Sequence, residues 1–548
     1  MTDFTRRDLF KFGGVAAAGV AGATFLASCA PSSGKDSGAA GASSASDEVT
    51  GVAGHYRSGL PSFLEAPEAI TDIAETKEYD VVIVGAGAAG VPAAISALEA
   101  GASVALIQKE NQAISQGNTA TGILADQSDP AGIEAVVSTL LKEHQYRANR
   151  QQVELWAKNS GEAITWLFEL GQKVGAQVSD TTPKWTAAVK QVNGYNVNYL
   201  SIDFGPKPYN TGDGMRALAE YAEQQGVEIF YSTEAKQLAG DVSGITGVIA
   251  KAKDGNIQFN AKKGVILATG DYQNDDEMMD YYLPDLKYMG RKQQNKTGDG
   301  HKMAIWAGGE MERISHTKML HDFDGGPGSM CDIPFLAVKT ATGERFCNET
   351  CGMSLMNCFL NSEEDQGNYA QIFDSTYLTQ AAEWGGKLLD PEALKAYMPE
   401  EDGEKTGVYK DQIATFKADT LDELAKKLEI ADVAAFKKSV ERYNELAAKG
   451  ADEDFGKPAK FLGTISEPPF YGMHRHVRIS AVVSGVNVGE HLEVLAAGTN
   501  DPIPGLYAVG NTAGNFYDGI DYTMWMAGLS LGRAHTQGYV TGKYVASL

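Results

Sequence analysis

The stretch over residues 78–110, EYDVVIVGAGAAGVPAAISALEAGASVALIQKE, constrains the fold more than any other part of the sequence. The apolar run at 81–84 predicts a buried β-strand, and the next six residues are Gly-Ala-Gly-Ala-Ala-Gly. A helix-forming run and a second apolar strand at 104–107 follow. This order of strand, glycine turn, helix and strand predicts a dinucleotide-binding βαβ unit, and the alternative is a βαβ unit that binds nothing.

Three glycines give this pattern its physical meaning. Gly85 allows a tight turn, Gly87 lets the backbone approach a pyrophosphate, and Gly90 lets the helix pack closely on the strand. The N-terminus of the helix then offers free N–H groups to the phosphates. One position departs from the pattern, because Gln108 occupies the end of the second strand, where an acidic residue usually binds the ribose. Its amide oxygen can still accept a hydrogen bond, and Glu110 shares its strand face.

The first 29 residues resemble an export signal. Arg6 and Arg7 precede a weakly apolar Ala/Gly-rich run at 13–27, which is too short to span a bilayer and resembles a twin-arginine signal. The run ends in Leu-Ala-Ser-Cys, which resembles a lipobox, so the mature chain is expected to begin at a lipid-bearing Cys29. The alternative is a plain signal that is removed together with Cys29. Residues 30–74 are predicted to form a flexible linker, since their first part is rich in Ser, Gly and Ala.

The composition restricts the partners. The formal net charge is -24, which argues against nucleic acid and anionic membrane surfaces as partners. Apart from Cys29, the cysteines cluster between residues 331 and 358, and in an exported chain such cysteines could be thiols, disulfides or an iron–sulfur site. Their spacing matches no metal-binding motif, so no metal ligand is predicted. These four positions are Cys331, Cys347, Cys351 and Cys358.

Several later segments also have a predicted role. The small polar stretch at 115–123 lies where the backbone must approach a ligand. Amphipathic periodicity predicts helices over 152–171 and 420–450, and neither carries obvious chemistry. The apolar run at 264–267, followed by Ala-Thr-Gly, predicts another buried strand that ends in a tight turn.

The order of these motifs is similar to that of a known family, the flavoprotein subunit of the fumarate reductase and succinate dehydrogenase superfamily. This superfamily includes soluble fumarate reductases, urocanate reductase and 3-ketosteroid Δ1-dehydrogenases. The resemblance extends over about residues 75 to 548 and rests on residues 85–90, 117–119, 268–270, 297–300, 343–346, 348–349 and 504–511.

The resemblance implies an α/β fold with non-covalently bound FAD. A Rossmann-like FAD-binding domain would comprise residues 75–312 and 480–548, and an inserted α+β capping domain would comprise 313–479. By the same resemblance, the residues expected to bind the cofactor are Gly85, Ala86, Gly87, Ala88, Ala89, Gly90, Gln108, Lys109, Gly117, Asn118, Thr119, Ala120, Gly122, Ala268, Thr269, Gly270, Asp299, Asn511, Gly528, Leu529 and Ser530.

The chemistry of this family is hydride transfer between flavin N5 and a carbon, coupled to proton transfer at the neighbouring carbon. Fumarate reductases use an arginine acid from the cap and further arginines and histidines to bind two carboxylates. Here the segment before Gly343 contains no arginine, and residues near Ser480 and Ala481 replace the expected histidine pair. Fumarate is therefore predicted to be a poor substrate, and a neutral carbonyl compound or an aromatic acid is favoured.

The C-terminal motif suggests the catalytic group. Asn511 replaces a glutamate of fumarate reductases, and ketosteroid dehydrogenases resemble this chain in that asparagine and in a tyrosine near Tyr522. A phenol, with a pKa of about 10, can donate a hydrogen bond to a carbonyl, or a proton if a relay recharges it. Tyr522 is thus predicted as electrophile or acid, with a buried structural tyrosine as the alternative. Asp521 could orient it, and His316 weakly matches a histidine at the cap entrance.

Arg475 and Arg478 are weaker candidates for substrate contacts, since arginines in such positions more often pack or lie at the surface. The sequence shows no second glycine fingerprint for NAD(P)H and no CxxCH haem motif. Electrons are therefore expected from an external donor protein, a cytochrome or flavin carrier linked to quinone. The expected location is the outer face of the cytoplasmic membrane or the periplasm.

Three functions remain open. The first is an extracytoplasmic FAD-dependent reductase that uses an activated C=C bond, in an enoate or enone, as a respiratory electron acceptor. The second is the reverse chemistry, a dehydrogenase that introduces a C=C bond next to a ketone. The third, from another class, is an exported lipoprotein that binds a ligand without turnover.

Overall fold

The computed structural model describes residues 49–50, 56–57, 60–182, 191–206, 210–313, 315–322, 329–384, 394, 398, 415–519, 521–523 and 525–548. The chain forms two compact units, Met1–Gly59 and Leu60–Leu548. In the first unit, β1 (Val49–Thr50) pairs antiparallel with β2 (Tyr56–Arg57). The predicted signal at 1–29, including Cys29, lies outside the described residues.

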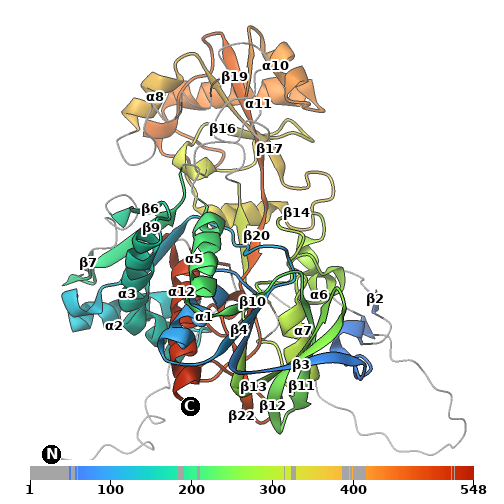
Figure 1. Ribbon diagram of the computed structural model, residues 1–548. Helices are drawn as coiled ribbons and strands as arrows, with labels where there is room; N and C mark the ends of the chain where they lie inside the picture. The colour runs from blue at the N-terminus through green and yellow to red at the C-terminus, as the bar shows by residue number, and fades with distance from the viewer. Residues whose placement is uncertain are drawn as a thin grey trace, which may run out of the picture. The chain divides into compact units, whose positions relative to one another are not determined.

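The second unit is built on one mixed sheet, drawn in the lower half of Figure 1. Four pairings in it are parallel: β10 with β4, β4 with β3, β3 with β13, and β13 with β22. Strands β11, β12 and β13 form an antiparallel meander on one side. The strands are β3 (Ile73–Val84), β4 (Val104–Ile107), β10 (Glu228–Phe230), β11 (Glu234–Asp241), β12 (Gly244–Ala252), β13 (Gly255–Leu267), β21 (Glu493–Leu495) and β22 (Pro502–Ala508).

The parallel strands are apolar because both faces are covered. Residues 81–84 and 104–107 are buried throughout, as the sequence predicted. Helices α1 (Gly90–Glu99) and α12 (Leu529–Ser547) pack against each other and against this part of the sheet. Their approach is so close that a Cβ on Gly538 would lie 2.0 Å from the carbonyl oxygen of Ala89.

A smaller antiparallel sheet, β5–β9–β6, carries the polar stretch near residue 120. Helix α3 packs on it, and α2 packs on α3. The elements are β5 (Thr119–Ile123), β6 (Val178–Asp180), β9 (Tyr199–Phe204), α2 (Pro130–Glu143), α3 (Arg150–Lys173) and α5 (Thr211–Gln225). Other described elements are β7 (Gln191–Val192), β8 (Tyr195–Asn196), α6 (Asp276–Tyr282), α7 (Asp299–Trp306) and the 3-10 helix η8 (Met353–Phe359).

The inserted segment forms a second antiparallel sheet in the order β16–β17–β19–β18, and Figure 1 shows these strands grouped with α8, α10 and α11. We refer to this sheet and these three helices as the cap. Phe436, Val440 and Tyr443 of α11 are buried in its core, as expected from the periodicity. The elements are β16 (Leu336–Lys339), β17 (Asn368–Asp374), α8 (Tyr377–Glu383), β18 (Thr415–Ala418), α10 (Leu421–Lys427), α11 (Val433–Lys449) and β19 (Phe470–His476).

A three-stranded sheet, β14–β20–β15, combines two strands that precede the cap in the chain with one strand that follows it. It consists of β14 (Gly290–Arg291), β15 (Lys318–His321) and β20 (Arg478–Val482), so only Val477 separates β20 from the cap strand β19. The predicted domain boundary at 479/480 falls within β20 and stays a prediction. The predicted linker 30–74 is described only in part, and there Phe63 packs, buried, against Tyr281 and Tyr282.

Candidate FAD and substrate site

The glycine turn lies directly between β3 and α1. Gly85 has φ +106°, and its N–H donates to the carbonyl oxygen of Ile107 at 2.8 Å. A Cβ on Gly85 would lie 2.4 Å from the carbonyl oxygen of Ala268, and a Cβ on Gly90 would lie 1.8 Å from that of Gly85. No side chain caps the N-terminus of α1, whose N-cap residue is Ala89. The helix end is thus open to a ligand, and an anion suits it.

The other parallel strands end beside this turn. Gln108, directly after β4, is buried, and the Nζ of Lys109 lies 2.8 Å from an Asp299 oxygen. After β13, the backbone N–H of Thr269 donates to the Thr512 hydroxyl at 3.0 Å. The structure therefore brings together predicted cofactor residues that are far apart in the sequence, at the carboxyl edge where open α/β sheets bind ligands.

A second uncapped helix N-terminus comes from α12. Gly528, its N-cap residue, has φ +77°, and a Cβ there would lie 2.5 Å from the Thr121 hydroxyl oxygen. The carbonyl oxygen of Gly528 accepts a hydrogen bond from the N–H of Thr121 at 3.1 Å. A Cβ on Gly117 would lie 3.0 Å from Leu531. The predicted cofactor residues around Gly117–Gly122 and 528–530 therefore lie side by side.

These features fit FAD. Two helix N-termini without side-chain caps suit a pyrophosphate and a polar ring edge. The glycines around them leave the backbone bare at points where a Cβ would clash with other backbone. Gln108 and the Lys109–Asp299 pair add hydrogen-bonding groups at the same edge. The assignment of individual residues to parts of the cofactor stays a prediction.

Tyr522 lies at the N-terminus of α12. Its hydroxyl oxygen accepts a hydrogen bond from the backbone N–H of Ser530 at 3.3 Å. Its ring packs on Tyr517, with 5.4 Å between ring centroids, and joins an apolar cluster that includes Met319, Ala481 and Met526. Burial raises the pKa of Tyr522 far above its ordinary value, Tyr517 raises it further, and the N–H of Ser530 and the charge of Arg533 oppose the rise. The phenol is therefore protonated at neutral pH.

Asp521, beside this tyrosine, is held by other groups. Its carboxylate lies 2.7 Å from the Lys318 ammonium and accepts a hydrogen bond from the Asn357 amide. The backbone N–H of Tyr522 in turn donates to the carbonyl oxygen of Lys318 at 3.0 Å. Asp521 thus anchors the loop before Tyr522 to β15, and an orienting role through the backbone is consistent with this geometry.

His316 lies in a buried aromatic cluster. Its Nδ1 contacts the Tyr272 hydroxyl, its Nε2 lies 3.2 Å from the carbonyl oxygen of Glu312, and its ring stacks on Tyr282 at 4.1 Å. Burial lowers the pKa of His316 to about 3, so the ring is neutral. Both ring nitrogens face protein partners, which gives the ring a packing role in this structure.

The two candidate arginines differ in place. Arg475, in β19, is 2% exposed, and its Nε donates to Gln371 at 2.8 Å while another nitrogen donates to the carbonyl oxygen of Asp322 at 3.2 Å. It is therefore held inside the cap. Arg478 begins β20, opposite Gly290 of β14. Ser480, two residues on, accepts a hydrogen bond from the Gln116 amide at 2.6 Å through its carbonyl oxygen.

Sequence reasoning missed two buried charges that contact the segment 511–515. Arg533, in α12, is fully buried, and one of its terminal nitrogens donates to the Asn511 side chain at 2.6 Å. Glu312 is 3% exposed and accepts a hydrogen bond from the backbone N–H of Asn515. The sequence contained one signal for the burial of Arg533. Glycines at positions 532 and 538 indicate that this helix is closely packed by its neighbours.

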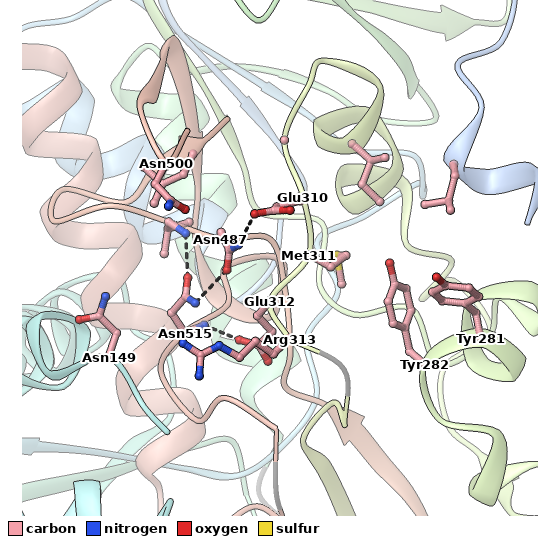
Figure 2. A pocket seen from close by; sticks show the side chains of 15 residues that line it. Asn149, Tyr281, Tyr282, Glu310, Met311, Glu312, Arg313, Asn487, Asn500 and Asn515 are labelled. Atoms are coloured by element: carbon pink, nitrogen blue, oxygen red, sulfur yellow. Dashed lines mark hydrogen bonds between the residues drawn. The ribbon is translucent and has the colours of Figure 1, made fainter. Parts of the chain in front are cut away.

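Glu312 also lines a cavity of about 850 Å³, shown in Figure 2. Its walls carry amide and charged side chains, among them Asn487, Asn515, Glu310 and Arg313. None of the predicted cofactor residues lines it. The cavity therefore differs from the cradle formed by the glycine turn and α12.

The cysteine cluster consists of free thiols. Cys331, Cys347, Cys351 and Cys358 are all unpaired. Burial raises the pKa of the Cys347 thiol well above its ordinary range. Within the described ranges, no three His, Cys, Asp or Glu side chains form a group suited to a metal ion.

Residues 80–522 match the family described as FAD binding domain. The vinyl phenol reductase of Lactiplantibacillus plantarum is 28% identical over 507 residues, which cover 86% of this chain and 97% of that protein. The open conformation of a flavocytochrome c3 fumarate reductase is similar with a TM-score of 0.65 and 23% identity, over 87% of this chain and 79% of that one. The 3-ketosteroid Δ1-dehydrogenase of Sterolibacterium denitrificans is similar with a TM-score of 0.66 and 18% identity, over 86% of this chain and 100% of that one.

The two solved structures confirm the predicted fold class, and the family match confirms FAD as the cofactor and the predicted superfamily resemblance. The predicted twin-arginine signal and lipid anchor are not tested by these matches. Among the described residues, no helix combines the length and apolar character needed to cross a membrane. This chain belongs to the FAD binding domain family and is an FAD-dependent oxidoreductase.

Proposed function

We propose that the protein reduces an activated C=C bond and that Tyr522 supplies the proton. The observation that carries this proposal is the placement of Tyr522, whose hydroxyl meets the N-terminus of α12 inside an apolar cluster. The neighbouring 528–530 segment belongs to the uncapped helix end that fits FAD. A neutral phenol here can donate a proton to a carbon beside the one that receives a hydride.

The reaction balances with one hydride and one proton. Reduced FAD, when bound, supplies the hydride to one carbon of the double bond. Tyr522 transfers its hydroxyl proton to the other carbon, so that a CH–CH bond and a tyrosinate result. The backbone N–H of Ser530 faces the oxygen that becomes negative, and the positive end of the α12 dipole stabilises that charge. A proton from solvent then restores the phenol.

The surroundings of Tyr522 favour a neutral or aromatic substrate. Tyr522 and Trp525 both pack against a buried apolar cluster that includes Met319 and Ala481, so this side of the tyrosine offers apolar surface. Arg475, a candidate carboxylate ligand, is held inside the cap by its own partners. The similar vinyl phenol reductase takes its name from an aromatic substrate with a C=C bond. These points support enones, vinyl phenols and aromatic enoates over fumarate.

The reverse reaction is the second candidate. Asn511 and Tyr522 resemble the corresponding residues of ketosteroid dehydrogenases, and such an enzyme shares this fold. In that direction Tyr522, as a tyrosinate, would take a proton next to a ketone, and a bound oxidised FAD would be the acceptor that the hydride of the neighbouring carbon requires. The potential of the bound FAD and the electron partner decide between the directions.

Electron supply and location belong to the same proposal. We infer an external donor, a cytochrome or flavin carrier linked to quinone, and export to the outer face of the cytoplasmic membrane or the periplasm with a lipid at Cys29. The sequence pattern at Arg6, Arg7 and Cys29 supports export. Fumarate reductases of the flavocytochrome type carry cytochrome in their name, which agrees with such a donor.

The test is an anaerobic turnover assay. The FAD-loaded protein is supplied with reduced viologen dye, and dye oxidation is followed with vinyl phenol, cinnamates, urocanate, fumarate, enones and steroid enones. We expect rapid oxidation with one neutral or aromatic class. Tyr522→Phe should lower kcat by roughly 10²–10⁴-fold while FAD stays bound. Tyr146→Phe is the matched control, because Tyr146 is 75% exposed and should not matter.

Other outcomes separate the hypotheses. If no C=C compound is reduced but a saturated ketone reduces an artificial electron acceptor, the protein is a dehydrogenase and the proposed reductase function is wrong. If Tyr522→Phe turns over as fast as the wild type, the assignment of the acid is wrong. A protein that binds these compounds without any turnover in either direction would be a ligand-binding lipoprotein.

A further inference from the structure

A buried cation lies behind Tyr522. The Arg533 side chain is fully buried, donates to Asn511 at 2.6 Å and to the carbonyl oxygen of Ala513 at 3.4 Å, and lies 5.0 Å from the Tyr517 ring centroid. Among the described residues, no carboxylate oxygen lies within 4.0 Å of its guanidinium. A buried charge without a close counter-ion is costly, so more distant charges must compensate it.

Glu312 and Arg533 hold the same short segment of the chain. Arg533 donates to the Asn511 side chain and to the carbonyl oxygen of Ala513, and Glu312 accepts from the backbone N–H of Asn515. The negative charge of Glu312 in this position favours the positively charged form of Arg533 and so opposes the lowering of its pKa by burial. One carboxylate oxygen of Glu312 accepts from the Asn515 N–H, and the other has no hydrogen-bond partner among the described residues. Burial raises the pKa of Glu312 to about 7, Asp518 raises it too, and the Ser484 hydroxyl, the Asn515 N–H and Arg533 oppose the rise.

Water can supply this carboxyl with protons from the cavity in Figure 2, whose wall Glu312 forms. Exposed Glu310 and the neighbouring Arg313 line the same cavity. Tyr522 does not line this cavity.

Three other titratable groups lie around Glu312 or Arg533. His316, whose Nε2 faces the Glu312 carbonyl oxygen, is neutral because burial lowers its pKa to about 3. Burial raises the pKa of Asp518, which lies 3.8 Å from Arg147. Burial raises the pKa of Tyr517 to about 12, so it also stays neutral.

We propose that Glu312 is a positioning residue for proton transfer from Tyr522: its carboxylate offsets the charge of Arg533, and its acid form leaves that charge free to stabilise the tyrosinate. This inference rests on the proposed acid role of Tyr522. The positive charge of Arg533 already favours the ionised form of both Tyr517 and Tyr522. Protonation at the cavity thus makes the phenol a stronger acid without touching the substrate.

The sign of the effect follows from the charges. Above neutral pH, Glu312 is ionised, Arg533 is compensated and the tyrosinate is less stable. Below neutral pH, Glu312 is neutral and proton donation is easier. Glu312→Gln mimics the acid form at every pH. If the substitution lowers the pKa of Tyr522 by one unit, the proton-transfer equilibrium changes about tenfold at pH 9.

The test combines two measurements on the FAD-loaded protein. Infrared difference spectra follow the carboxyl C=O band as pH rises from 5 to 9, and a band that titrates near neutral pH should vanish in Glu312→Gln. It should remain in Glu310→Gln, which makes the same change at an exposed site in the same cavity. In Arg533→Gln the titration midpoint of the Glu312 carboxyl should move to higher pH, because the positive charge that lowers the pKa of Glu312 has been removed.

The second measurement is kcat against pH with the best acceptor of the viologen panel. The wild type should lose rate above neutral pH, and Glu312→Gln should keep its rate and exceed the wild type about tenfold at pH 9. The visible spectrum of each variant checks that FAD is bound, and a variant that has lost FAD is not compared. In that case Glu312→Asp, which keeps a titratable carboxyl group, is measured, and it should show the pH dependence of the wild type.

The failures are distinguishable. A carboxyl midpoint that Arg533→Gln leaves unchanged, or a pH profile that is the same in Glu312→Gln and wild type, would overturn the inference. Full activity of Tyr522→Phe would instead overturn the proposed acid, whatever the infrared spectra show.

Discussion

Replacing Arg345 with methionine should destabilise the cap strongly, because this arginine is the centre of a buried charge cluster. Its guanidinium donates to both oxygens of Glu349 at 3.0 Å and to both of Asp452 at 3.1 and 2.7 Å. The Lys457 ammonium lies 3.2 Å from Glu349. The cluster holds two positive and two negative charges, and it ties the turn after β16 to the segment that follows α11.

The substitution leaves one uncompensated negative charge among side chains that are fully buried at Glu349 and Asp452. Removing one partner of such a pair costs about 3–5 kcal/mol. Methionine has a similar volume to arginine, so the loss of stability reflects the missing charge and not a cavity. In hydrogen exchange, the amides of α11 should then exchange about 10²- to 10⁴-fold faster.

Hydrogen exchange followed by mass spectrometry is the assay, because it reports the cap separately from the FAD-binding sheet. Arg442→Met is the matched control: Arg442 also binds a carboxylate through two nitrogens, at 3.0 and 2.8 Å to Asp454, but lies at the surface. Its loss should leave exchange nearly unchanged, because exposed pairs contribute little. Equal exchange rates in Arg345→Met and the wild type would refute the reasoning.

Two further predictions concern cofactor binding and pH. Gly90→Ala should release FAD, since the new Cβ would lie 1.8 Å from the Gly85 carbonyl oxygen, whereas Gly352→Ala, with open space around it, should retain FAD on gel filtration. Melting temperatures should fall as pH drops below 6.5, because buried neutral histidines take up protons on unfolding. Each such histidine lowers the free energy of unfolding by about 1.4 kcal/mol per pH unit, down to the pKa that it has in the folded protein. His316→Phe should flatten this slope, and an unchanged slope would contradict the assignment. The histidines with lowered pKa values are His144, His301, His316, His321 and His535.

The FAD-binding sheet could be predicted because its signals are local. The glycine turn after β3 and the apolar run that becomes the end of β13 each encode strand, turn and burial within a few residues. Parallel strands then bring their carboxyl ends to one edge, so residues near 108 and 269 lie at the same edge, on either side of β3.

The charges around Tyr522 could not be predicted in the same way. The burial of Arg533 depends on the close packing of α12, which sequence periodicity does not reveal. Glu312 lies in the chain beside a predicted domain boundary and meets Asn515 only through tertiary structure. Likewise, nothing local to His316 indicates that its ring faces Tyr272 and Tyr282.

The direct passage of the chain from β19 to β20 connects the cap to the loop that carries Tyr522. Val477, fully buried, is the single residue between the cap sheet and the strand that carries Ser480. β20 pairs with β15, whose Lys318 holds both the backbone and the side chain of the loop before Tyr522. We therefore expect a rotation of the cap sheet to move the phenol, through the backbone at Val477, the β15–β20 pairing and the Lys318–Asp521 ion pair.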